Sequence, residues 1–121
     1  MFKHISIIYR PPNKTHEETV QYWKDVHNFV VKSRLPKLRK YVGNFPVQSP
    51  QSDVKQPGGG QQMQCDAIVE LHFDTLEDLT AAMTGSAWMS DERKASSTKF
   101  MDYTRMTYVV MEEVVIPLDK K

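Results

Sequence analysis

Apolar and polar residues between Thr15 and Val31 alternate with the period of a helix. Large or apolar side chains recur every three to four residues and form one stripe, which consists of Val20, Trp23, Val26, His27 and Val30. Thr15 can cap the first turn, and Glu18 can reach back to it and complete a capping box. The pattern predicts a helix that begins at Thr15 and ends before Pro36, with Trp23 and His27 facing the core.

Four segments have the β-branched, alternating composition of strands. The clearest covers 65–73, where one face carries Ala67, Val69, Leu71 and Phe73 and the other carries mostly polar residues. The other three cover 2–10, 40–47 and 106–116, and each ends at or near a proline, which cannot donate to a ladder of hydrogen bonds. Gly43 predicts a β-bulge in the strand at 40–47.

A second helix and one long loop complete the pattern. Thr75 and Asp78 predict a capped helix over 76–83 that ends at Gly85. The next segment, 86–97, is predicted to be a short helix or irregular. Residues 48–64 are polar and rich in glutamine, glycine and proline, which predicts an exposed, flexible loop within a single domain of residues 1–121.

The order of these elements is strand, helix, strand, strand, helix, strand, as in ferredoxin-like folds. Right-handed crossovers place both helices on one face of a four-stranded antiparallel sheet, so the predicted fold class is α+β. The first strand is apolar on both faces, with Ile5 and Ile7 on one and Phe2 and Ile8 on the other. Because the helices cover one face only, we predict a homodimer in which a second copy covers the other.

Composition narrows the class of protein. Sixteen basic and fifteen acidic residues leave a net charge of +1, which favours neither nucleic acid nor an anionic membrane as a partner. The sequence contains no apolar run long enough for a transmembrane helix, and its N-terminal stretch does not have the pattern of a signal peptide. The single cysteine, Cys65, cannot form an internal disulfide. We therefore expect a soluble, cytoplasmic protein.

Five short motifs cover most of the chain in a fixed order: YWKDVH at 22–27, LPKLRKYVGN at 35–44, AIVELHFDTLEDL at 67–79, AW at 87–88 and MEEVV at 111–115. Together they resemble the EthD family. This resemblance implies a ferredoxin-like, dimeric α+β barrel, in agreement with the topology, and a small-molecule pocket bordered by Trp23 and His27. More distantly, the fold resembles polyketide cyclases, methylmuconolactone methylisomerase, cofactor-free quinol monooxygenases and haem-degrading enzymes.

His27 is the candidate catalytic residue. An imidazole ordinarily titrates near pH 6 to 7, which suits a general acid or base at cellular pH. Spacing alone favours a histidine buried in the core or at a dimer edge, whereas the resemblance favours a role in the pocket. Trp23 likewise can be core packing, a wall of the pocket, or both.

Further pocket residues are expected from the strands. Periodicity turns Ile5 and Ile7 toward the helices and His4 away, whereas a resemblance to plant-type polyketide cyclases places His4 in the pocket. Tyr41 can supply a phenol hydroxyl or be structural. The other predicted substrate-binding residues form an apolar wall with one tryptophan from the AW motif: Ala67, Val69, Leu71, Trp88, Tyr108 and Val110.

The sequence predicts no metal site and no cofactor. The four histidines have none of the spacings typical of metal ligands. The fold makes haem conceivable, with His27 as an axial ligand, but the sequence does not favour it.

Three functions remain open. The first is cofactor-independent proton transfer on a small aromatic, polyketide-like or lactone substrate, by an isomerase, dehydratase or cyclase that uses His27 as its general acid/base. The second is oxidation, as a cofactor-free monooxygenase or as an accessory to an oxidising system. The third is binding of a metabolite without catalysis.

Overall fold

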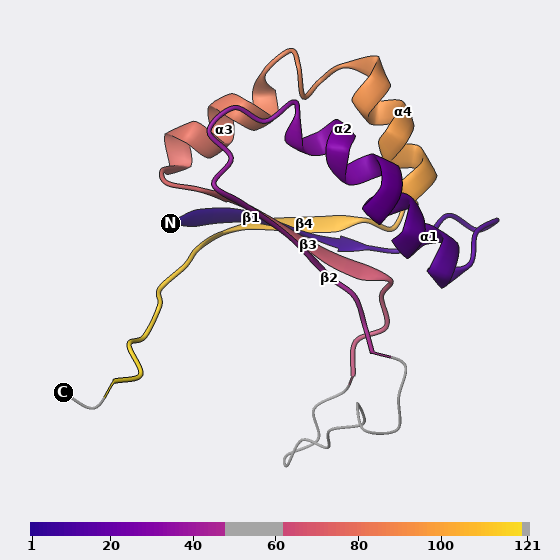
Figure 1. The fold of residues 1–121 in the computed structure, drawn as a ribbon, viewed down its shortest axis with the longest axis horizontal. Helices are drawn as coiled ribbons and strands as arrows, with labels where there is room; N and C mark the ends of the chain where they lie inside the picture. The colour runs from indigo at the N-terminus through magenta and orange to yellow at the C-terminus, as the bar shows by residue number, and fades with distance from the viewer. Residues whose placement is uncertain (48–61, 120–121) are drawn as a thin grey trace.

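Four antiparallel strands form the centre of the protein in a computed structural model that describes residues 1–47 and 62–119. Their order across the sheet is β2-β3-β1-β4. The strands are β1 (Phe2–Ile8), β2 (Lys40–Asn44), β3 (Ala67–Phe73) and β4 (Thr107–Glu112). All the helices lie on one side of this sheet (Figure 1). The predicted ferredoxin-like α+β fold is thereby confirmed, because both crossovers return to the same face.

The covering layer contains helical segments from two parts of the chain. The first part consists of α1 (His16–Tyr22), the π-helical turn η1 (Trp23–His27) and α2 (Asn28–Lys32), and the second of α3 (Leu76–Thr84) and α4 (Asp91–Phe100). Thr15 and Glu18 form the predicted capping box, with N···O distances of 3.1 and 2.9 Å. None of the described helices has the length and apolar character needed to cross a bilayer.

The predicted helix from Thr15 is interrupted by the wide turn η1. A π-turn contains one more residue than an α-turn, so the buried stripe shifts along the sequence after it. His27 and Val31 are buried, whereas Val26 is 43% exposed, and the prediction that Val26 faces the core is wrong. The Asn28 side chain donates to the backbone oxygens of Trp23 and Lys24, both at 2.7 Å, and so stabilises the wide turn.

The register of β1 decides which of its residues face the helices. His4 is paired with Leu71 of β3 and with Val110 of β4, and directly paired residues of antiparallel strands share a face. His4 therefore faces the helices and Ile5 faces away from them. The expectation from periodicity is wrong and the expectation from the family resemblance is right, because the apolar Ile5 and Ile7 belong to the side without helices.

Two groups of buried apolar residues fill the space between the sheet and the helices. The first contains Val31, Leu35, Leu71, Phe73, Leu79 and Ala82, and the second contains Ile8, Ala67, Val69 and Phe100. Members of both groups line the cavity described below.

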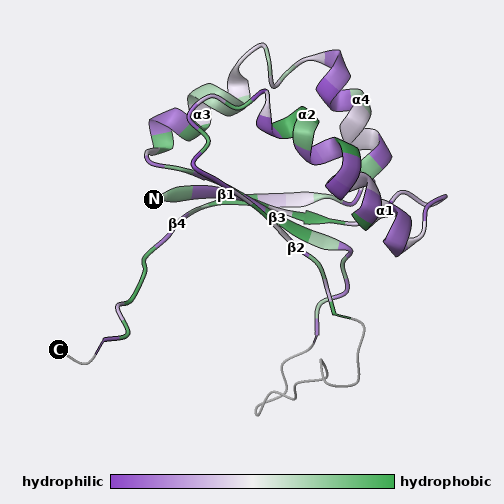
Figure 2. Ribbon diagram, viewed as in Figure 1, coloured by the Kyte–Doolittle hydropathy of each residue, from purple (hydrophilic) through white to green (hydrophobic). Residues whose placement is uncertain are grey.

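The open face of the sheet and the chain after β4 are rich in apolar residues. By register, the open face carries Ile5, Ile7, Val42, Ile68, Val109 and Met111. The C-terminal arm, residues 113–119, leaves the sheet with several green, apolar residues along it (Figure 2). Four of its side chains are between 69% and 88% exposed: Val114, Val115, Ile116 and Leu118.

The strands are shorter than predicted. The strand expected over 106–116 ends at Glu112, because Glu112 is paired with Phe2 and β1 offers no earlier strand residue to pair with. The strand expected over 2–10 ends at Ile8, and the strand expected over 40–47 ends at Asn44. The strand expected over 65–73 begins at Ala67. The predicted loop at 48–64 lies outside the described residues except for 62–64, which are exposed.

Gly43 does not form the predicted bulge. It is paired with Val69 in an unbroken register between β2 and β3. A Cβ atom at this position would lie 2.8 Å from Cη2 of Trp23 and 3.0 Å from Cε2 of Phe45. Glycine is therefore required here by the close approach of the Trp23 indole to the strand.

Replacing Gly43 with alanine is expected to lower the free energy of unfolding by about 1–3 kcal/mol, because the new methyl group overpacks the indole. Urea denaturation measures this loss. Gly85→Ala is the matched control, since its Cβ would lie 3.2 Å from the Ala81 oxygen and meet no side chain. In a Trp23→Phe background the cost of Gly43→Ala should shrink, and an undiminished cost would contradict the proposed clash.

Candidate functional site

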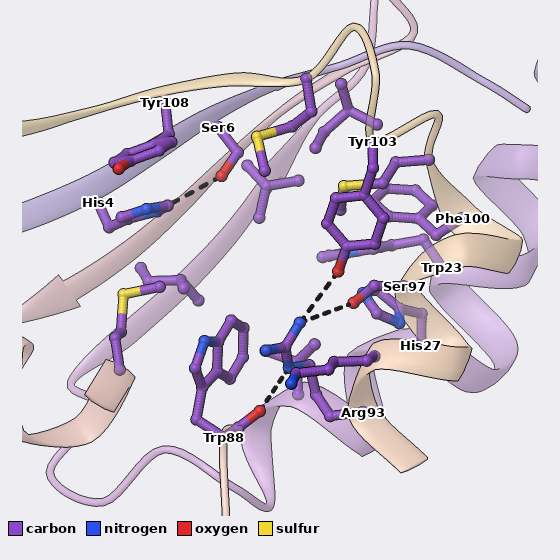
Figure 3. A pocket seen from close by; sticks show the side chains of 18 of the residues that line it. His4, Ser6, Trp23, His27, Trp88, Arg93, Ser97, Phe100, Tyr103 and Tyr108 are labelled. Atoms are coloured by element: carbon purple, nitrogen blue, oxygen red, sulfur yellow. Dashed lines mark hydrogen bonds between the residues drawn. The ribbon is translucent and has the colours of Figure 1, made fainter. Parts of the chain in front are cut away.

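A cavity of about 440 Å³ lies between the helices and the sheet, within the range typical of small-molecule sites (Figure 3). Most of its wall is aromatic or apolar: Ile8, Trp23, Val31, Tyr41, Val69, Leu71, Met83, Trp88, Phe100, Met101, Tyr103, Met106 and Tyr108. Its polar lining consists of His4, Ser6, His27, Arg93, Lys94 and Ser97. Such a wall suits a small, mostly apolar molecule that a few polar groups orient.

His27 lies at the end of η1 and is only 3% exposed. Its Nδ1 atom is 2.9 Å from the Ser96 hydroxyl, which is itself 2.9 Å from the Tyr22 hydroxyl. The imidazole stacks on Phe100 with 5.0 Å between ring centroids. Nε2 has no hydrogen-bond partner among the described residues and keeps some accessible surface, and His27 is one of the residues that line the cavity.

The environment of His27 makes its imidazole a weak base. Burial, reinforced by the positive charge of Arg93, lowers the pKa of His27 to about 4. The expectation that this residue titrates near pH 6 to 7 is therefore wrong. The ring is neutral at cellular pH and can accept or donate a hydrogen bond there without carrying charge.

Trp23 and Tyr41 form one wall of the cavity. The indole Nε1 of Trp23 donates to the Tyr41 hydroxyl at 3.1 Å, and the indole meets the rings of Tyr41 and Phe45 edge-on. Burial raises the pKa of Tyr41, so the phenol keeps its proton. Because the hydroxyl oxygen accepts from the indole, its own hydrogen is available to a ligand.

His4 and Tyr108 form the opposite part of the wall, on the sheet. Their rings stack with centroids 5.1 Å apart and an interplanar angle of 15° (Figure 3). The Nδ1 atom of His4 is 3.4 Å from the Ser6 hydroxyl. Burial lowers the pKa of His4, which makes a second neutral imidazole in the same cavity.

Arg93 and its neighbours on α4 line the cavity, and the sequence did not reveal them as candidate site residues. Its guanidinium carbon lies 4.0 Å from the centre of the Trp88 ring, and Nε donates to the Trp88 backbone oxygen at 2.6 Å. The segment 91–100 is so polar that no apolar stripe marks it as a covering helix. One signal was present, because Ser90 can cap a helix that places Arg93, Ser97 and Phe100 on one face at spacings of four and three.

Eight of the ten predicted site residues line the cavity: His4, Trp23, His27, Tyr41, Val69, Leu71, Trp88 and Tyr108. Their contact with a ligand stays a prediction. Ala67 and Val110 do not line it, and these two placements are corrected. Ala67 is sealed between the sheet and the helices with Ile8 and Phe100, and Val110 lies on the edge strand β4, where its side chain is 41% exposed.

The open face carries a charged cluster of its own. Lys3 lies 3.1 Å from a carboxylate oxygen of Glu70 and 3.2 Å from one of Glu113, and His72 lies 3.0 Å from Glu70. This places Glu70 and His72 opposite the cavity wall, as predicted from alternation. Within residues 1–47 and 62–119, no group of three or more His, Cys, Asp or Glu side chains is arranged to hold a metal ion.

The four-stranded sheet, with the described helices on one face and a cavity between the two layers, defines a ferredoxin-like α+β domain. Residues 11–109 match the EthD domain, and the chain belongs to the EthD family. The sequence has no match among the curated proteins.

Solved structures share this fold. An ethyl tert-butyl ether D (EthD) family protein from Bacillus halodurans C-125 has a TM-score of 0.67 at 19% identity, over 94% of this chain and 99% of that one. An EthD-like protein from Ralstonia eutropha JMP134 has a TM-score of 0.61 at 18% identity, over 98% of this chain and 97% of that one. A third structure is a protein from Bacteroides fragilis NCTC 9343, described as dimeric, of unknown function and with a ferredoxin-like fold. It has a TM-score of 0.57 at 14% identity, over 93% of this chain and 95% of that one.

Proposed function

We propose that the protein binds a small, planar, mostly apolar molecule in the cavity and moves a proton on it without a cofactor. The reaction would be an isomerisation, dehydration or cyclisation of an aromatic, polyketide-like or lactone substrate. The observation that carries this proposal is the neutral, buried imidazole of His27, which lines the cavity and whose Nδ1 is held by Ser96 while Nε2 has no hydrogen-bond partner among the described residues.

The contacts of Ser96 are compatible with either neutral tautomer of His27. When the Ser96 hydroxyl donates to the Tyr22 hydroxyl, the Ser96 oxygen accepts a hydrogen bond from Nδ1–H of His27. Nε2 then has a free lone pair that can take a proton from the substrate. When the hydroxyl donates to Nδ1 instead, Nε2 carries the hydrogen and acts as a donor. Changing from the first arrangement to the second requires the ring proton to move from Nδ1 to Nε2 as well as rotation of the hydroxyl, and the neutral Nε2–H then donates a hydrogen bond without giving up its proton.

A base with a pKa of about 4 needs an acidic substrate proton or a stabilised product anion. The cavity supports the second condition, because the protonated Tyr41 hydroxyl can donate to a developing enolate oxygen. The surrounding aromatic rings exclude water and limit the orientations that a flat substrate can adopt.

Solvent exchange into a panel of small carbon acids tests this proposal. We expect the protein to accelerate deuterium incorporation from D₂O at the acidic carbon of some members of a panel of aryl ketones and unsaturated lactones, followed by NMR. Exchange at the buffer rate across the whole panel would contradict proton transfer. Oxygen uptake with a quinol substrate would instead support the oxidising alternative.

The low basicity of His27 favours a second candidate, binding without turnover. A neutral, weakly basic imidazole is suited to hydrogen-bond a ligand and less suited to deprotonate it. Tight binding of a panel member that shows no exchange would support this function.

We further propose that two copies pair through the open faces of their sheets. The support is the apolar character of this face, the exposed apolar arm at 113–119, and the dimeric description of the B. fragilis neighbour.

Sedimentation at micromolar concentration is expected to give twice the 14.0 kDa chain mass. Val109→Asp on the open face should dissociate the dimer, because a carboxylate would be buried without a partner. Val26→Asp is the matched control, since Val26 on the helical side is 43% exposed and Val109 is 42% exposed. A monomeric wild type would contradict the pairing.

A further inference from the structure

Arg93 carries a buried charge that no described carboxylate neutralises. Its side chain is 6% exposed, and its hydrogen-bond partners are all neutral: the Trp88 oxygen and the hydroxyls of Ser97 and Tyr103, at 2.6, 3.4 and 3.1 Å. More exposed cations of the same chain, such as Arg34 and Lys3, do have carboxylate partners. Arg93 is therefore an exception to the rule that buried ions are paired.

The guanidinium has unused donor capacity on the cavity side. The described hydrogen bonds engage Nε and Nη1, whereas Nη2 has none within residues 1–47 and 62–119. Figure 3 shows the group between Trp88 and Tyr103, among the side chains that surround the cavity. A guanidinium in this position is suited to a carboxylate, which can accept a charge-assisted hydrogen bond from Nη2.

The charge of the cavity wall also favours an anionic ligand. The wall carries Arg93 and Lys94 but no aspartate or glutamate among the described lining residues, although the whole chain is nearly balanced at +1. A cavity with cationic groups and no acidic ones attracts anions, and its low polarity strengthens that attraction.

We infer that Arg93 binds the carboxylate of the cavity's ligand, so that the ligand is a small, planar, mostly apolar carboxylic acid. The inference rests on the cavity's being the ligand site, as in the proposed function, but it does not require turnover. The Trp88 ring would pack against the apolar body next to the carboxylate.

One helix then orients the ligand relative to His27. Ser96 contacts His27 and Ser97 contacts Arg93, so neighbouring residues of α4 hold the two polar groups at the cavity. An acid whose carboxylate lies on Arg93 would present its opposite end or ring edge along the wall that contains His27. The bound anion would also offset the Arg93 charge, which is one of the causes of the low pKa of His27.

Matched acids and amides test the inference. Phenylacetate and phenylacetamide have nearly the same shape and differ in charge, and their dissociation constants can be measured by NMR titration of the full chain. We expect the acid to bind about 10- to 100-fold more tightly than the amide, as charge-assisted hydrogen bonds require. Arg93→Gln should abolish the preference, and Arg93→Lys, which keeps the charge without the fork, should retain part of it.

Two controls keep the test decisive. Arg34→Gln removes a guanidinium that is paired with Glu92 away from the cavity, and it should leave the preference unchanged. If Arg93→Gln does not fold, Arg93→Lys and the wild-type salt dependence serve instead, because added salt should weaken binding of the acid and not of the amide.

Several results would overturn the inference: equal affinities for acid and amide, no binding of the acid at millimolar concentration, or a preference that survives in folded Arg93→Gln. A rise in the pKa of His27 with phenylacetate but not with phenylacetamide, seen by ¹⁵N NMR, would support it. Failure of deuterium exchange with an intact acid preference would reject proton transfer while leaving the role of Arg93 standing.

Discussion

Replacing His27 with glutamine is expected to lower the turnover of a proton-transfer substrate by about 10²- to 10⁴-fold, the usual contribution of a positioned general acid or base. Glutamine has a similar reach and can still hydrogen-bond Ser96, so the cavity should keep its shape. It cannot take a proton from carbon. The Michaelis constant should therefore change much less than the turnover number.

Two further variants separate catalysis from packing. Ser96→Ala leaves the imidazole in place and removes its orienting partner, so its loss of turnover should be smaller than that of His27→Gln. His16→Gln is the control histidine, because His16 contacts Asp66 at 2.9 Å and does not line the cavity. Turnover by His27→Gln within a few-fold of the wild type would reject the catalytic role.

The pH profile provides an independent measurement of the same group. The active form of a base is unprotonated, so kcat/KM should rise as pH increases through about 4 and then remain level through neutral pH. A limb near pH 6.5 that disappears in His27→Gln would show that the imidazole is more basic than its surroundings imply.

Acidification from pH 7 to pH 4 is expected to remove about 3 kcal/mol of the free energy of unfolding through His27 alone, since each unit of pKa difference corresponds to about 1.4 kcal/mol. The pKa is about 4 in the folded protein and has an ordinary value of 6.5. The unfolded chain therefore binds the proton first. The contribution is complete above pH 6.5 and is lost as pH falls from 6.5 toward 4.

Urea denaturation of the wild type and His27→Gln at both pH values isolates this effect. The decline between pH 7 and pH 4 should be about 3 kcal/mol smaller in the variant. His4, whose pKa is also lowered, remains in both proteins, so its contribution cancels in the comparison. Equal declines in the two proteins would show that protonation of His27 is not linked to unfolding.

Features that depend on neighbouring residues were predictable from the sequence. The cap formed by Thr15 and Glu18 needs only a separation of three residues, and the alternation in β3 needs only a period of two. The strand and helix order then leaves few topologies, because crossovers have one handedness. The pairing of Trp23 with His27 on one helical face also follows from spacing.

Features that depend on distant residues were not predictable. Val26 is exposed because one wide turn, stabilised by Asn28, changes the phase of the helix. Gly43 makes room for the indole of Trp23 and does not form a bulge. This role could not be predicted, because it depends on the contact between β2 and η1. The strand at β4 ends at Glu112 because its partner β1 begins at Phe2.

By itself, the sequence determined the fold class, the family motifs and most of the apolar wall, because periodicity and capping act over a few residues. Only the tertiary structure decided the chemistry of the site. It turned His4 toward the helices and placed Arg93, from a helix without an apolar stripe, beside the cavity. It also buried His27, and this burial, reinforced by the charge of Arg93, lowers the pKa of His27. Electrostatic interactions and burial depend on distance in space, and residues 27 and 93 become neighbours only when the chain is folded.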